Sequence, residues 1–163
     1  MSTLDTQLSP LCSLPCSVRF TIWSMRVAWL SIHGAEGAQA RLREIGRLLQ
    51  IEDGVVALER FLSLLESNAR KPLDIREFGS TYPSAAEIDL LVALGWLQEG
   101  RTPCGERVLG GYSSAIHLES VVAAASFWVA CLLRSQIMLP HFEEVTDPTP
   151  ATENYRPVHA MMH

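Results

Sequence analysis

Residues 119–134 read ESVVAAASFWVACLLR and contain no charged side chain between Glu119 and Arg134. This uncharged run is shorter than the roughly 20 residues that a membrane-spanning helix needs, so it predicts a buried helix and no membrane span. We expect the helix to extend over residues 115–137. Because it is apolar almost all round from Val121 to Leu133, it is predicted to be the central helix against which the others pack.

Segments with apolar residues at helical spacing precede this run. They cover residues 18–33, 36–50, 53–71 and 85–99, with a shorter segment at 102–109. Ser84-Ala-Ala-Glu87 is a capping box, in which two backbone amides are satisfied reciprocally, and it marks a helix start. Ser17, Asp53 and Thr102 are expected to be N-cap residues. The sequence therefore predicts an all-α fold, a single domain of five or six helices packed around an apolar C-terminal helix.

The 163 residues fit one domain of ordinary size. Residues 1–16 contain two prolines and no helical period, and are interpreted as a leader arm before a helical domain at residues 17–140. Residues 141–163 carry four acidic side chains, one basic side chain and three prolines. Segments of this composition bury too little apolar surface to offset their ordering entropy, so a disordered acidic tail is predicted.

Charge and cysteine usage narrow the classes of function. The formal net charge is −5 and the sequence pI is about 5.5, which disfavours nucleic-acid binding. The first residues lack the basic and apolar regions of a signal peptide. Four cysteines, at positions 12, 16, 104 and 131, show no disulfide spacing. These features predict a cytoplasmic protein, and we expect a bacterial one.

Arg19, Arg26 and His33 recur every seven residues and form a polar row on the first predicted helix. Apolar residues flank the row on both sides, among them Trp23, which is unusual for a solvated helix face. One interpretation is a partly buried site in which the cations bind an acidic partner or ligand. The other is that they pair with Asp or Glu side chains of a neighbouring helix.

No motif indicates a metal, a cofactor or a catalytic centre. Cys12 and Cys16 lack the second pair that structural zinc prefers, and His33 and Cys104 could complete the ligand set only through the tertiary fold. His159 and His163 flank two methionines, and imidazole and thioether groups are ligand types that suit copper. The simpler interpretation is a frayed chain end. Nucleophile elbows and phosphate-binding loops are absent from the sequence, so an enzyme would need a site assembled by tertiary structure.

Residues 94–109, Leu-Gly-Trp-Leu-Gln-Glu-Gly-Arg-Thr-Pro-Cys-Gly-Glu-Arg-Val-Leu, resemble a stretch of winged-helix domains. There a helix ends, a short wing passes, and a Thr-Pro-x-Gly helix follows. The resemblance implies a nucleic-acid-binding module. The sequence departs from that pattern because it lacks the long basic wing, and because Glu87 and Asp89 stand where a groove-reading helix carries Arg, Asn or Gln.

Three functions follow from these observations, in decreasing order of support. The first is a non-catalytic interaction or regulatory protein that acts through a helical surface and binds a protein partner or a second copy of itself. The predicted surface contains Arg19, Trp23, Arg26 and His33. The second is a sensor of a small ligand or cofactor, with a pocket between the first and last helices. The third is the winged-helix-like nucleic-acid-binding module.

Overall fold

The computed structural model describes residues 9–143 and is all-helical, with 67% of these residues in helices. A short 3-10 turn precedes six α-helices. In chain order they are η1 (Leu11–Ser13), α2 (Cys16–Ile32), α3 (Ala38–Leu49), α4 (Glu52–Ser67), α5 (Ala85–Gln98), α6 (Thr102–Gly110) and α7 (Ala115–Arg134). The predicted all-α single domain is confirmed.

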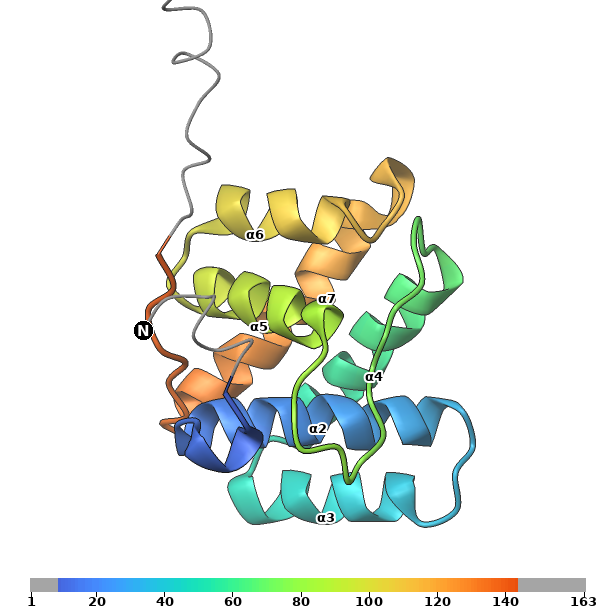
Figure 1. Ribbon diagram of the computed structural model, residues 1–163, viewed down its shortest axis with the longest axis vertical. Coiled ribbons are helices and arrows are strands. Elements are labelled where there is room, and N and C mark those ends of the chain that lie inside the picture. The colour runs from blue at the N-terminus through green and yellow to red at the C-terminus, as the bar shows by residue number, and fades with distance from the viewer. Residues whose placement is uncertain (1–8, 144–163) are drawn as a thin grey trace, which may run out of the picture.

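The apolar C-terminal helix packs against other helices as expected, but α5 is the more enclosed of the two. Eleven of the fourteen residues of α5 are buried, against eight of the twenty in α7. Figure 1 shows α5 in the middle of the fold, with α6 on one side, α2 on the other and α7 behind it. α7 packs against α4, α5 and α6, and the rest of its surface is open.

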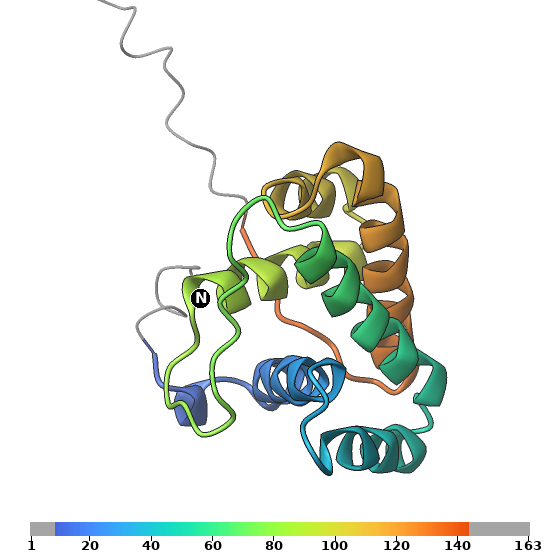
Figure 2. The same cartoon turned by 90° about the vertical axis from the view of Figure 1, so that its right-hand side faces the viewer.

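α4 and α7 lie side by side and run in opposite directions (Figure 2). At one end Gly54 allows a close approach, because a Cβ atom at this position would lie 2.7 Å from Cβ of Cys131 and 3.2 Å from the Trp128 ring. At the other end Ser114 N donates to Asn68 O at 3.3 Å. These contacts fix the antiparallel register of the two helices.

Local signals predicted the helices well and some of their ends less well. The Ser84–Glu87 capping box is confirmed, with both of its side-chain bonds present. Ser17, Asp53 and Thr102 are not N-caps, because α2, α4 and α6 each begin at or before them and the N-cap residues are Pro15, Ile51 and Arg101. The last helix ends at Arg134, three residues before the predicted end, because Gln136 adopts a left-handed conformation with φ of 60°.

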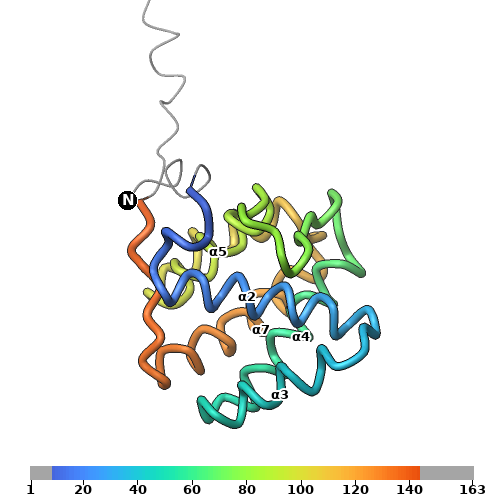
Figure 3. The backbone as a smooth tube through the Cα atoms, turned by 60° about the horizontal axis from the view of Figure 1, so that its bottom comes forward, coloured from blue at the N-terminus to red at the C-terminus, as the bar shows by residue number. Residues whose placement is uncertain are grey.

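The packed chain extends beyond the predicted domain boundaries at both ends. Leu14 lies in the core at 4% exposure, so the predicted leader arm at residues 1–16 is partly folded. After α7 the chain passes beside the beginning of α2 (Figure 3). There Phe142 is 3% exposed, and its carbonyl accepts a hydrogen bond from Trp96 Nε1 at 2.9 Å. Packing therefore continues past residue 140 as far as Phe142, while the rest of the predicted tail, residues 144–163, lies outside the described residues.

The stretch that resembles a winged helix contains no wing. Between α5 and α6 the chain turns within Glu99–Arg101, and Gly100 there has a φ of 79°. Within residues 9–143 the strand-type pairing is limited to one isolated bridge between Ala69 and Ser113. The resemblance thus extends only to the way one helix ends and the next begins.

Candidate functional site

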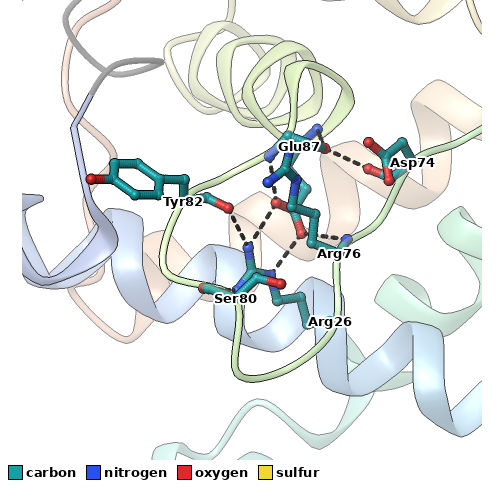
Figure 4. A network of polar contacts seen from close by, with 7 residues as sticks. Arg26, Asp74, Arg76, Ser80, Tyr82 and Glu87 are labelled. Atoms are coloured by element: carbon teal, nitrogen blue, oxygen red, sulfur yellow. Dashed lines mark hydrogen bonds and ion pairs between the residues drawn. The ribbon is translucent and has the colours of Figure 1, made fainter.

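Arg26, the middle member of the predicted cationic row, is buried and paired inside the fold. Its Nε donates to Glu87 Oε1 at 2.8 Å and its Nη2 to Glu87 Oε2 at 3.0 Å. Nη1 also donates to Ser80 O at 2.8 Å, and Nη2 to Tyr82 O at 3.2 Å (Figure 4). Only 2% of Arg26 is exposed, so its guanidinium does not face an external ligand.

Glu87 is as fully satisfied as its partner. Its two oxygens also accept from Arg76 N at 3.1 Å and from Ser84 N at 2.9 Å. Ser84 Oγ in turn donates to Asp74 O. A buried ion pair is stable only when its remaining hydrogen-bonding capacity is filled, and here the loop between α4 and α5 supplies those groups. This network joins α2, α5 and that loop, which is the internal pairing that the sequence left as its second interpretation.

The other members of the predicted site point to separate surroundings. Arg19 is exposed, and its Nη2 donates to Cys16 Sγ at 3.1 Å. Trp23 is half-buried, with its ring centroid 6.1 Å from that of Phe20 and 6.4 Å from that of Phe78. The latter contact holds the loop before α5 against α2.

His33, the last predicted site residue, pairs with a neighbouring helix. Its Nε2 lies 2.6 Å from Glu66 Oε1 on α4, and its Nδ1 lies 2.7 Å from Trp29 O. The hydrogen bond to the Trp29 carbonyl and the interaction with the Glu66 carboxylate raise the pKa of His33. Both side chains are about two-fifths exposed, so this is a surface ion pair. The four predicted residues therefore do not converge on one site.

Metal-ligating and nucleophilic side chains do not cluster in the described part of the chain. Between residues 9 and 143 no cluster of three or more His, Cys, Asp or Glu side chains could hold a metal ion. Cys131 is buried, and burial raises the pKa of its thiol, which disfavours the nucleophilic thiolate. Tyr112 donates to Asp89, and burial raises the pKa of its phenol. Cys131 packs against Gly54 of α4, and the Tyr112–Asp89 bond joins the end of α6 to α5.

A shallow hollow of about 500 Å³ lies between α4 and α7. Four residues come from each helix: Asp53, Val56, Ala57 and Arg60 from α4, and Ser120, Ala123, Ala124 and Phe127 from α7. Val56 is 62% exposed and Phe127 is 48% exposed. We call this set of residues the α4–α7 surface.

The chain matches no protein-family model, no curated protein and no solved structure.

The outer face of α7 is uncharged over four helical turns. Between Glu119 and Arg134 the exposed side chains are Ser120, Ala123, Phe127, Ala130 and Leu133. By length and composition α7 could cross a bilayer, a property that the core helices of soluble proteins share, and 44% of its apolar window is buried here. These five side chains form one continuous uncharged face on the outside of the fold.

Asp53 and Arg60 border the α4–α7 surface with opposite charges. Among the described residues neither side chain forms a hydrogen bond or an ion pair. Both are exposed, and a spacing of seven residues places them within about 20° of each other on α4. The surface can therefore bind an apolar helix and pair with one charge at each end of the contact.

The sequence did carry a signal for this surface. Ser120, Ala123, Phe127, Ala130 and Arg134 share one face of the last helix. Because the helix is apolar almost all round, the sequence does not show which of its sides the neighbouring helices cover.

Proposed function

We propose that this protein is a non-catalytic interaction protein that docks a helical partner surface on its α4–α7 surface. The observation that carries the proposal is the uncharged outer face of α7, which has Phe127 about half exposed at its centre. Burying an aromatic side chain of this kind is a typical source of binding energy at protein interfaces. The proposal replaces the predicted surface on α2, where Arg26 is internal.

The shape and the position of the hollow support a docking surface. The hollow is open and shallow, whereas pockets for small ligands enclose most of the ligand's surface. It also lies between α4 and α7, whereas the pocket of the alternative ligand sensor was predicted between the first and last helices. All four cysteines are free thiols, and two of them are exposed, which suits the reducing cytoplasm that we propose as the compartment.

The test places a photo-crosslinking benzophenone side chain at Phe127 in the full chain. A matched probe at Leu48, which is 72% exposed on α3, serves as the control position. We expect position 127 to give one dominant crosslinked product in cells of the native host. Excess wild-type protein should suppress this product, and excess Val56→Asp protein should not. Equal labelling from both positions, or no product from position 127, would refute the proposal.

A further inference from the structure

We propose that the occupant of the α4–α7 surface is a second copy of this chain, docked about a two-fold axis with α4 antiparallel to its own counterpart. The inference rests on the proposed function and names the partner. A two-fold contact requires a patch that is complementary to itself, so that when one residue meets a second residue of the other copy, the reverse contact also forms. The charges of the α4–α7 surface meet this requirement.

The charges on α4 are arranged for reciprocal pairing. Asp53 and Arg60 lie about 10 Å apart along the helix axis, with Val56 and Ala57 between them. The two-fold axis lies in the plane of the interface, at right angles to α4, and passes over the helix between Val56 and Ala57. Rotation about this axis reverses the direction of α4 in the second copy. Asp53 then faces the partner's Arg60, and Arg60 faces the partner's Asp53. Two equal ion pairs form, and the apolar residues lie between them.

The same axis also matches the charges on α7. Gly54 lies level with Trp128 and Cys131, and Asn68 lies level with Ser114. Interpolating between these contacts places the centre of the Asp53–Arg60 interval level with positions 126 and 127. These positions are also the centre of the interval between Glu119 and Arg134. The same two-fold axis therefore brings Glu119 of one copy opposite the partner's Arg134, in addition to the pairs between Asp53 and Arg60 on α4.

The size of the surface sets the expected strength. α7 is about 30 Å long, and two packed helices are about 20 Å wide, so each copy presents about 600 Å². A total of about 1,200 Å² is at the lower end of the range for specific interfaces. We therefore expect a dimer with a dissociation constant in the micromolar range.

The experiment measures self-association of the full chain by sedimentation, and compares charge-reversed variants. Asp53→Arg and Arg60→Asp each replace two attractive contacts with two repulsive ones. Each is expected to raise the dimer Kd by about 30-fold. Glu106→Arg, at an exposed position on α6, makes the same change in net charge as Asp53→Arg and should leave the Kd unchanged. Helical circular dichroism reports whether each variant folds.

Mixing the two weakened variants gives the decisive result. A heterodimer of Asp53→Arg with Arg60→Asp has unlike charges at both contacts, one pair reversed and one native. The mixture should therefore dimerise as well as the wild type, although each component alone does not. The doubly reversed chain, with both substitutions, should also regain the wild-type Kd. No misfolded variant can produce this recovery.

The alternatives give distinct outcomes. A monomer at concentrations up to about 1 mM, or a mixture that fails to recover, would overturn the second copy as occupant. In that case a wild-type crosslink from position 127 to a different protein would leave the proposed function standing. Binding of the wild-type chain, but not of Phe127→Ser, to phosphatidylglycerol-containing vesicles would overturn both, because a lipid surface would then cover the outer face of α7.

Discussion

Replacing Arg26 with glutamine tests the buried network directly. The substitution removes both bonds to Glu87, at 2.8 and 3.0 Å, and the donors to the carbonyls of Ser80 and Tyr82. Glu87 would keep two backbone donors, but its charge would stay buried at 0% exposure without a counter-ion. Breaking a buried ion pair in this way costs about 3–5 kcal/mol.

The two loop carbonyls add little to this loss, because they can regain water when the loop moves. The expected change is a large part of the roughly 5–15 kcal/mol by which a domain is stable. Urea denaturation followed by helical circular dichroism measures it. Arg19→Gln, which changes an exposed arginine on the same helix, should stay within about 0.5 kcal/mol of the wild type.

A double-mutant cycle separates the ion pair from general damage to the core. Once Arg26 is glutamine, Glu87→Gln removes the unpaired charge and keeps a side chain that can accept in the capping box. The double variant should therefore be more stable than Arg26→Gln alone. Trypsin should also cut after the exposed Arg76 faster in the single variant, because the loop loses its anchor on α2. A loss below about 1 kcal/mol in the single variant, or additive losses in the cycle, would refute the reasoning.

Three other substitutions test the remaining packing and electrostatic arguments. Glu66→Gln should lower the pKa of His33, which an NMR titration measures. The ion pair between His33 and Glu66 should contribute less than about 1 kcal/mol to the free energy of unfolding. This contribution should be present below about pH 6.5 and should be lost as the pH rises through the raised pKa of His33. Gly54→Ala should destabilise by about 1–3 kcal/mol in thermal denaturation because its methyl group meets α7, whereas Gly110→Ala, whose nearest neighbour would be 3.6 Å away, should not destabilise. Phe142→Ala should cost about 3 kcal/mol, and an unchanged melting temperature would show that this ring is not part of the core.

Local sequence determined the helices because the interactions that start and stop a helix lie within a few residues of one another. The Ser84–Glu87 box needs only a spacing of three, and both of its bonds form. The left-handed residue at Gln136 was missed, since glutamine carries no preference for that conformation that would mark it as a stop. Local sequence could not predict the burial of Phe142, because its partner Trp96 on α5 is 46 residues away.

The partner of Arg26 and the open face of α7 both depend on contacts between residues that are far apart in the sequence. Arg26 and Glu87 are 61 residues apart, and the row on α2 showed only that the arginine needed an acidic partner. Which acid it meets follows from how α5 crosses α2 in the folded chain. Similarly, the sequence showed that α7 is apolar on all sides, but a helix cannot reveal how many of its sides its neighbours cover. Because α5 takes the enclosed position and α4 approaches α7 through Gly54, one face of α7 stays open, and only the tertiary structure decided which face that is.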